Sequence, residues 1–360
     1  MLPLPIFDYH RPRTLVEAVS LLHDLGDKAR IIAGGTDVLP NMKQGLFDPA
    51  HVVSVAKLEE LRGIAIERVP STSGEHDAGN GKPGAGNGKP GEAVGPAGQE
   101  RLVIGAGMKL AEIADSLLVQ RAAPALAEAC GLVGGPHHRA MGTLGGNVCL
   151  DTRCRYYNQT YFWRKALGFC IKKDGTVCHV VKGGSKCVAA ASNDSAPVLI
   201  ALDAEIELLG PSGARTVAAQ DFYTADGIKN TVIEPGEIVV RVALPLVPGR
   251  RSAFEKLRRR GAIDFPLLSI AARVDHDEAA AGAVSAVSVV VSSLGARPRR
   301  LRAAAKIASG SLADRLPQAL ADAAYTECRP LTNLDEDSDW RHEMVPVLVK
   351  KALERAALAR

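Results

Sequence analysis

The chain has 360 residues, of which 46% are hydrophobic and only 4% aromatic, so its cores must be largely aliphatic. This length predicts two to three domains. The formal net charge of +4 is small, and there is no basic helix or aromatic-interleaved basic sheet, which argues against a nucleic-acid partner. We find neither a secretory signal nor a run of ~18 apolar residues, and therefore expect a soluble, cytoplasmic protein with no membrane contact.

The first segment alternates predicted helices and strands. A helix is expected over residues 14–26, because Thr14 can cap it and apolar residues recur at helical spacing. Further elements are expected as a strand at 29–33, a helical turn at 38–44 and strands at 52–55 and 64–66. Residues 70–100 contain a Gly-Asn-Gly-Lys-Pro-Gly repeat without apolar periodicity, which predicts a flexible insertion between two strands.

The rest of the chain divides at about residue 228. Before that point we expect a strand at 101–106, helices at 109–118 and 121–130, and a helix or loop leading into a strand over 198–209. After it, a run of strands precedes helices at 312–327 and 340–359, which favours a separate α+β domain. The strands of that run are expected at 237–244, 253–258, 267–274 and 286–294.

Two glycine-rich turns are candidates for binding an anionic cofactor. Ala33-Gly-Gly-Thr-Asp37 lies between a strand and a helix, where adjacent glycines can present N–H groups to a phosphate. Met141-Gly-Thr-Leu-Gly-Gly-Asn147 offers the same close backbone approach, flanked by hydrogen-bonding side chains. Each alone is more typical of a plain turn. Together they fit a dinucleotide with two phosphates and a large ring, although neither is a Rossmann fingerprint.

Four of the seven cysteines are candidates for metal binding. Cys154, Cys170, Cys178 and Cys187 follow one another at steps of 16, 8 and 9 residues, with Cys149 just before them. Four thiolates can hold an iron–sulfur cluster or a structural zinc. There is no Cys-x-x-Cys pair, so the spacing alone is equally compatible with unligated thiols. The polar, turn-rich sequence between the cysteines favours a metal that organises the loop.

No catalytic residue is predicted. The His137-His138 pair is interpreted as a pair of loop histidines. The sequence contains no Ser/His/Asp set, no paired catalytic carboxylates and no His-Glu-x-x-His motif. These absences indicate a chain that carries redox groups and leaves bond chemistry to a partner.

The order of several motifs resembles one family. They are Phe7-Asp-Tyr-His-Arg-Pro12, Ala33-Gly-Gly-Thr-Asp-Val-Leu39, Gly142-Thr-Leu-Gly-Gly-Asn147, Asn193-Asp-Ser-Ala-Pro197 and Ala253-Phe-Glu-Lys256. In this order they resemble the FAD-binding subunit of the xanthine dehydrogenase/carbon monoxide dehydrogenase, or molybdenum hydroxylase, family. The resemblance implies an α+β protein with a vanillyl-alcohol oxidase-type FAD-binding fold of two α/β subdomains plus a C-terminal α+β domain.

The resemblance also implies a domain division and a set of FAD contacts. The FAD-binding domain would span residues 1–227, with the insertion at 70–100 and an iron–sulfur loop at 150–190, and the C-terminal domain residues 228–360. The implied contacts to FAD are Ile31, Ile32, Ala33, Gly34, Gly35, Thr36, Asp37, Val38, Thr143, Gly146, Asn147, Asp194 and Lys256.

The cysteine loop resembles one subgroup of this family more than the others. Ordinary family members run from the Gly-Gly-Asn motif almost directly to the Asn-Asp motif, whereas about forty residues intervene here. The loop resembles that of the β subunit of 4-hydroxybenzoyl-CoA reductases. This implies a [4Fe–4S] cluster on Cys154, Cys170, Cys178 and Cys187, with Cys149 as a possible substitute for Cys154.

The implied function is an electron relay. Ferredoxin would reduce the [4Fe–4S] cluster, which would pass electrons through FAD to the [2Fe–2S] clusters of a small subunit and on to molybdenum in a large molybdopterin subunit. The partner chemistry would be the reductive dehydroxylation that yields benzoyl-CoA in aromatic degradation, within a dimer of heterotrimers. Two alternatives stay open: the FAD subunit of an oxidising molybdenum hydroxylase that passes electrons to NAD or a quinone, and a zinc-organised scaffold without flavin.

Overall fold

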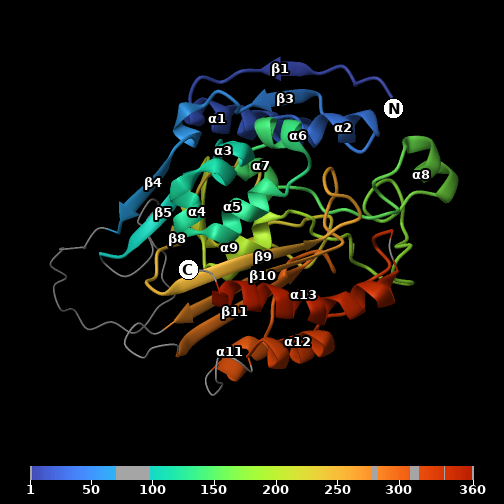
Figure 1. Ribbon diagram of the computed structural model, residues 1–360. Coiled ribbons are helices and arrows are strands. Elements are labelled where there is room, and N and C mark those ends of the chain that lie inside the picture. The colour runs from blue at the N-terminus through green and yellow to red at the C-terminus, as the bar shows by residue number, and fades with distance from the viewer. Residues whose placement is uncertain (1, 70–97, 277–282, 309–315, 336, 359–360) are drawn as a thin grey trace, which may run out of the picture.

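The computed structural model describes residues 2–69, 98–276, 283–308, 316–335 and 337–358. Figure 1 shows three sheets stacked from top to bottom, each with its own helices. The three-stranded sheet is N-terminal, the five-stranded sheet lies in the middle, and the four-stranded sheet belongs to the C-terminal part of the chain. No helix in these ranges has the length and apolar character of a membrane span.

The N-terminal unit is a small parallel sheet with the strand order β1-β3-β2. It consists of β1 (Asp8–His10), α1 (Leu15–Leu25), η1 (Gly26–Lys28), β2 (Ala29–Ile32), α2 (Val38–Lys43), β3 (His51–Ser54) and η2 (Glu59–Leu61). The predicted Thr14 cap and the predicted end of α1 near residue 26 are confirmed. The Thr14 hydroxyl accepts a hydrogen bond from Glu17 N at 3.2 Å, and Gly26, at a φ of 55°, closes the helix by donating its N–H to Leu22 O.

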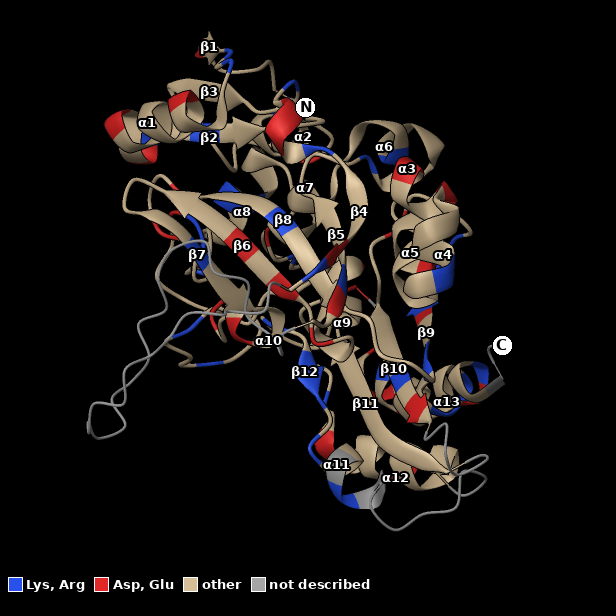
Figure 2. Ribbon diagram, turned by 90° about the vertical axis from the view of Figure 1, so that its left-hand side faces the viewer, with Lys and Arg blue, Asp and Glu red and all other residues tan. Residues whose placement is uncertain are grey.

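The middle unit is an antiparallel sheet with the order β4-β5-β8-β6-β7, formed by Ile64–Arg68, Glu100–Gly105, Ile238–Pro245, Glu205–Gly210 and Gly213–Ala218 respectively. Strand β6 alternates buried and half-buried residues, as expected for a sheet with one solvated face. Figure 2 shows acidic positions in red on β6 and basic positions in blue on β8. Ion pairs cross this face, for example Arg101–Glu205 at 2.9 Å and Arg241–Glu207 at 2.8 Å.

Helices cover the other face of this sheet and enclose the largest aliphatic core. They are α3 (Leu110–Asp115), α4 (Leu117–Ala122), α5 (Pro124–Gly131), α6 (Pro136–Met141), α7 (Leu144–Val148), α9 (Ser195–Ala201) and α10 (Ala219–Phe222). Two helices were predicted over 109–130, whereas the structure has three. The difference arises at Ser116, which caps α4, and at Pro124, which starts α5 because its missing N–H costs nothing in a first helical turn.

The C-terminal unit is a four-stranded antiparallel sheet with the order β12-β11-β10-β9. Its elements are β9 (Arg250–Leu257), β10 (Leu268–His276), β11 (Val284–Ser292), β12 (Arg299–Arg300), α11 (Ala303–Ala308), α12 (Leu316–Glu327) and α13 (Ser338–Leu358). The helices pack on one face of the sheet and form a second aliphatic core. The mixed fold, in which two units of sheet and helices are followed by an α+β unit, agrees with the predicted fold class.

Strand β8 bears on the predicted division at residue 228. It hydrogen-bonds with β5 on one side and β6 on the other, at the centre of the middle sheet. The division of the chain stays a prediction, and this pairing favours placing it after Pro245. Of the predicted insertion at 70–100, residues 70–97 lie outside the described residues.

Candidate functional site

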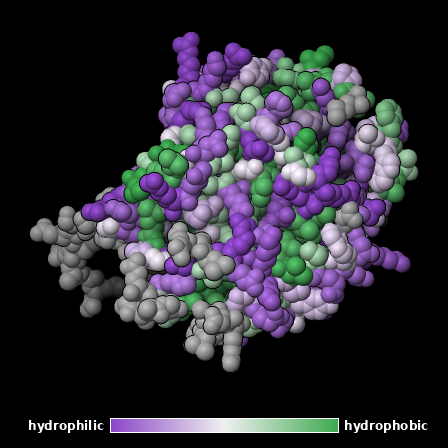
Figure 3. All heavy atoms as spheres, viewed as in Figure 1, coloured by the Kyte–Doolittle hydropathy of each residue, from purple (hydrophilic) through white to green (hydrophobic). Residues whose placement is uncertain are grey.

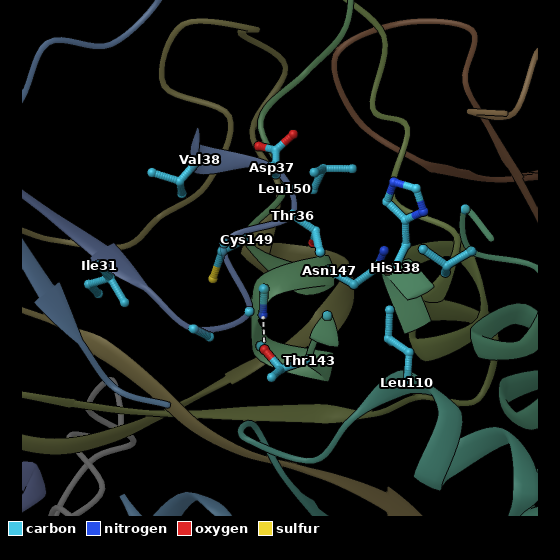
Figure 4. Close-up of a pocket in the computed structure, with 18 of the residues that line it drawn as sticks. Ile31, Thr36, Asp37, Val38, Leu110, His138, Thr143, Asn147, Cys149 and Leu150 are labelled. Carbon is cyan, nitrogen blue, oxygen red and sulfur yellow. Dashed lines mark hydrogen bonds between the residues drawn. The ribbon is translucent and has the colours of Figure 1, made fainter. Parts of the chain in front are cut away.

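A cavity of about 480 Å³ lies where the N-terminal unit meets the middle unit. Both glycine turns line it, together with the start of α7 and the loop that leads into α9. Figure 4 shows Ile31, Thr36, Asp37, Thr143 and Asn147 around this space. A volume of this size is typical of ligand and cofactor sites.

The first glycine turn packs directly on the second. Gly35 has a φ of 73°, a conformation that side chains rarely adopt. A Cβ on Gly34 would overlap the backbone carbonyl of Met141 and lie 2.9 Å from Gly142 N. Glycine at position 34 therefore allows the end of β2 to touch the end of α6, and this contact forms one wall of the cavity.

The second turn is held by its own side chains. The Thr143 hydroxyl caps α7 by accepting a hydrogen bond from Gly146 N at 3.1 Å, the dashed line in Figure 4. The Asn147 amide oxygen accepts hydrogen bonds from Ser195 N at 3.0 Å and Ser195 Oγ at 2.6 Å, which ties α7 to α9. Thr143 and Asn147 therefore fix the cavity wall.

A buried ion pair lies at the edge of the cavity. Lys256 Nζ is 2.9 Å from Asp194 Oδ2 and also donates to Leu132 O at 3.0 Å, and both charged side chains are at most 3% exposed. Burial, opposed by the Lys256 charge, raises the pKa of Asp194 to about 6. The other carboxylate oxygen, Oδ1, is buried without a hydrogen-bond partner among the described residues. Because Asp194 lines the cavity, this oxygen can accept a hydrogen bond from a ligand.

Arg153, which sequence reasoning missed, also lines the cavity. Its guanidinium pairs with the Asp37 carboxylate and lies 4.2 Å from the centre of the Phe265 ring. Burial raises the pKa of Asp37, and the charge of Arg153 opposes that shift. No motif marked Arg153, although its position directly before Cys154 could have drawn attention to it.

The structure brings eleven of the thirteen predicted contact residues to this cavity, namely Ile31, Ala33, Gly34, Gly35, Thr36, Asp37, Val38, Thr143, Gly146, Asn147 and Asp194. Ile32 instead points into a small apolar cluster with Met42 and Val52, and Lys256 acts through Asp194. Their roles toward FAD stay predictions. Among the residues that the sequence did not single out, the cavity also contains Leu110, Val133, Leu150, Ser192, Ile263 and Phe265.

The interpretation of His137-His138 as loop residues was wrong. Both lie in α6, which begins because Pro136 suits the first helical position and the side chain of His138 accepts a hydrogen bond from Gly135 N at 3.3 Å. His138 lines the cavity. The helix was missed because it has only six residues, too few to show helical periodicity.

The four candidate metal ligands gather in one place beside the cavity. Cys154, Cys170 and Cys187 are buried together with Leu46, Tyr157 and Ala189, and Cys178 is half-buried. Burial, and to a smaller extent the three other thiols, raises the pKa of Cys154 to about 12. No group of three or more His, Cys, Asp or Glu side chains in the described ranges is arranged closely enough to enclose a metal ion.

Cys149 lies in a different environment from these four thiols. It is open to the cavity and otherwise enclosed by protein, and this enclosure raises its pKa to about 12. Neighbouring Arg153 faces the same cavity, whereas Cys154 belongs to the apolar cluster on the other side. The chain thus passes from the cavity into the cysteine loop within a few residues.

Comparison with known proteins identifies the class. Residues 5–69 and 96–247 match the family model described as FAD binding domain in molybdopterin dehydrogenase, and residues 252–356 match the CO dehydrogenase flavoprotein C-terminal domain. The chain therefore belongs to the family of FAD-binding subunits of molybdenum hydroxylases, of the CO and xanthine dehydrogenase type. It is an oxidoreductase subunit that binds FAD.

Relatives of this class match over nearly their whole length. The carbon monoxide dehydrogenase medium chain of Hydrogenophaga pseudoflava is 28% identical over 358 residues, covering 99% of this chain and 98% of the relative. The xanthine dehydrogenase FAD-binding subunit of Escherichia coli O157:H7 is 25% identical, covering 98% and 96%. A solved carbon monoxide dehydrogenase from H. pseudoflava, which lacks the Mo-pyranopterin moiety of its cofactor, matches with a TM-score of 0.71 at 28% identity, covering 99% and 98%.

The residues that are present fit FAD. The cavity offers backbone N–H groups at two glycine turns for phosphates, and the unpartnered Asp194 oxygen for an N–H or O–H of the flavin portion. Apolar side chains such as Leu110, Val133 and Ile263 provide contacts for rings. These features agree with the family assignment.

Replacing Gly34 with alanine should weaken FAD binding, because the new Cβ would push the first turn away from the Met141 carbonyl. We expect the dissociation constant to rise at least about tenfold, equal to ~1.4 kcal/mol, in a fluorescence titration of the FAD-free chain. Gly261→Ala is the matched control, since a Cβ there meets nothing within 4 Å. Equal affinities of the two variants would contradict this account of the turn.

The buried Asp194 should make stability depend on pH. Its pKa rises on folding from 3.8 to about 6, so the folded state binds more protons and the free energy of unfolding should fall as the pH rises from about 4 to about 6. Relative to an Asp194→Asn/Lys256→Gln variant, we expect a loss of up to roughly 3 kcal/mol across this window. Urea unfolding at several pH values measures it, with Asp221→Asn, at an exposed position, as the control. A constant difference between wild type and the double variant would refute the shift.

Proposed function

We propose that the chain transfers electrons between FAD in the cavity and redox centres on two partner subunits, a large molybdopterin subunit and a small [2Fe–2S] subunit. The observation that carries this proposal is the convergence of both glycine turns and the unpartnered Asp194 oxygen on one cavity in a chain of this family. The name "medium chain" of the H. pseudoflava relative supports a complex with larger and smaller partners. We further propose the dimer of heterotrimers as its assembly.

The chain's own residues would bind and orient the cofactor. FAD when bound accepts and releases electrons one or two at a time, which suits it to a relay. The glycine turns would hold its phosphates, Asp194 would accept a hydrogen bond from it, and Lys256 would keep Asp194 ionised near neutral pH. Ile32 and Lys256 do not line the cavity. Ile32 would support the first glycine turn by packing against its apolar neighbours, and Lys256 would act through its ion pair with Asp194.

This proposal predicts a yellow protein that associates with its partners. The purified chain should contain about one FAD, as family membership requires, and should co-purify with the large and small subunits when they are expressed together. Visible absorbance and size-exclusion chromatography measure these outcomes. A colourless chain that carries zinc would support the flavin-free scaffold and overturn the proposal.

A second, more specific function is favoured by the cysteine loop. We propose that Cys154, Cys170, Cys178 and Cys187 hold a [4Fe–4S] cluster, which accepts electrons from ferredoxin and passes them to FAD. Cys154, Cys170 and Cys187 lie in one buried apolar group, and the thiol of Cys178 is near enough to act on the pKa of Cys154. Among the described residues these thiols do not enclose a single metal ion, so the proposal requires a larger centre between them. The direction would then be reductive, as in 4-hydroxybenzoyl-CoA reductases of aromatic degradation.

The named relatives favour the oxidising alternative. Those reported above are a carbon monoxide dehydrogenase and a xanthine dehydrogenase, and both names describe oxidations. In that alternative FAD would deliver electrons to NAD or a quinone, and the thiols would need no cluster. Iron content therefore separates the two functions.

Single Cys→Ser variants at positions 170, 178 and 187 should lose iron and keep FAD. A wild-type chain purified without oxygen should contain roughly four irons, measured by metal analysis and by electron paramagnetic resonance of the reduced protein. Cys328→Ser is the matched control, since this buried thiol lies in the C-terminal core. Comparison of Cys149→Ser with Cys154→Ser identifies the remaining ligand. A wild-type chain with FAD and no iron would leave the oxidising function as the one supported.

A further inference from the structure

The cysteine loop concentrates positive charge. Residues 155–187 include seven Lys and Arg residues and a single acidic residue, Asp174, in a chain whose formal net charge is +4. Lys165, Lys182 and Lys186 are exposed, and none of them pairs with an acidic side chain in the described part of the chain. Arg164 and Lys172 are buried inside the loop, so the positive charge of its outer surface comes mainly from these three lysines, while the rest of the chain is close to neutral.

The same loop also exposes large apolar side chains. Helix α8 (Tyr161–Leu167) leaves Phe162 69% and Trp163 42% exposed, and Val177 further along the loop is 53% exposed. Figure 1 shows α8 standing out at the right-hand edge of the molecule, and the same edge is partly green and pale in Figure 3. In a chain with only 4% aromatic residues, two adjacent exposed rings on one short helix indicate a contact surface.

This helix is fixed to the body of the protein, so the exposed rings have a defined place. The buried Arg164 donates hydrogen bonds to Gln44 O at 3.1 Å and Gly45 O at 2.9 Å. The Thr160 hydroxyl caps the helix, and His179 Nε2 lies 2.6 Å from Phe169 O, which joins the end of α8 to the later part of the loop. The outer face of α8 is therefore presented on a rigid support.

The exposed residues of the loop alternate along the chain with the candidate thiols. Cys170 follows α8 by three residues and is buried, whereas Cys178 is the least buried of the four and directly follows the exposed Val177. A redox centre on these thiols would thus be closest to solvent beside the apolar and basic residues. We call this surface the loop face and define it as Phe162, Trp163, Lys165, Leu167, Val177, Lys182 and Lys186.

We propose that the loop face docks a small acidic iron–sulfur protein that carries one electron at a time. The proposal rests on the electron-transfer function above and identifies where that partner binds. Positive charge attracts an acidic carrier, and the central apolar residues hold the encounter complex once water is displaced. Each encounter oxidises one reduced carrier and delivers one electron, so two encounters reduce the bound FAD fully, with protons taken from solvent.

The test compares a charge-reversed loop face with a matched charge reversal elsewhere. The first variant is Lys165→Glu/Lys182→Glu/Lys186→Glu. The second, Lys28→Glu/Arg121→Glu/Lys350→Glu, changes the net charge equally at exposed positions outside the cysteine loop. Flavin reduction by a reduced acidic ferredoxin is followed by stopped flow on the FAD-loaded full chain at several salt concentrations. Dithionite, which needs no docking surface, is the reference reductant.

We expect the loop-face variant to be reduced by ferredoxin at least about tenfold more slowly at low salt and to lose most of its salt dependence. The control variant should keep at least half of the wild-type rate, and dithionite should reduce all three proteins equally. A Phe162→Ser/Trp163→Ser variant should also be slowed, with its salt dependence intact, because only the apolar contact is lost.

Two outcomes would overturn the docking proposal. One is an equal ferredoxin rate in both charge-reversed variants. The other is a normal ferredoxin rate together with failure of the loop-face variant to co-purify with the large or small subunit, which would assign the surface to a permanent partner. If a chain without iron is still reduced by ferredoxin in a way that depends on the loop face, the docking proposal stands and the cluster proposal fails.

Discussion

The contact between Gly34 and the Met141 carbonyl is the constraint on which the cofactor site depends. Two separately built sheets can share a cavity only if their ends approach more closely than side chains allow, and the missing Cβ at Gly34 permits this. The partner surface is itself fixed, because Leu110 N donates to Gly142 O at 3.0 Å and Gly145 N donates to Ala106 O at 2.8 Å. The first glycine turn, the connection between α6 and α7, and the end of β5 therefore form one rigid support.

Arg153 extends this support to the cysteine loop. Its guanidinium belongs to the cavity through Asp37, and its backbone N–H donates to Ala190 O at 2.8 Å on the returning arm of the loop. Lys172 reinforces the base of the loop, with Nζ 2.7 Å from Asp151 Oδ1 and 2.6 Å from Thr152 Oγ1. The loop is thus attached to the flavin-type domain at the point where its redox groups would need to exchange electrons with the cofactor.

The sequence was informative where one local pattern determines the structure. Helical periodicity with a Thr14 cap predicted α1, and the glycine pairs predicted both cavity turns, since the conformations they adopt are open to few other residues. Helices α6, α7 and α8 were missed because five to seven residues are too few to show periodicity. The Arg153–Asp37 pair could not be predicted from the sequence for another reason. Its two residues are more than a hundred positions apart, and only the fold brings them together. Asp194 and Lys256 came from the family resemblance alone, since a lone buried carboxylate has no sequence signature.

The cavity and the cysteine loop are built from different residues. This explains why the relatives favour an oxidising function with NAD or a quinone, whereas the four thiols favour a ferredoxin partner. The cavity uses the common fold, which aligns along nearly the full length of dehydrogenase subunits and specifies FAD. The loop adds a buried group of thiols and three exposed lysines, Lys165, Lys182 and Lys186, none of which lines the cavity. The adjacent exposed rings of Phe162 and Trp163 add nothing to a core of this chain, which is the reason that we propose a contact with another protein there. The family fold thus accounts for the cofactor, and on the proposal made above the loop would select the protein with which that cofactor exchanges electrons.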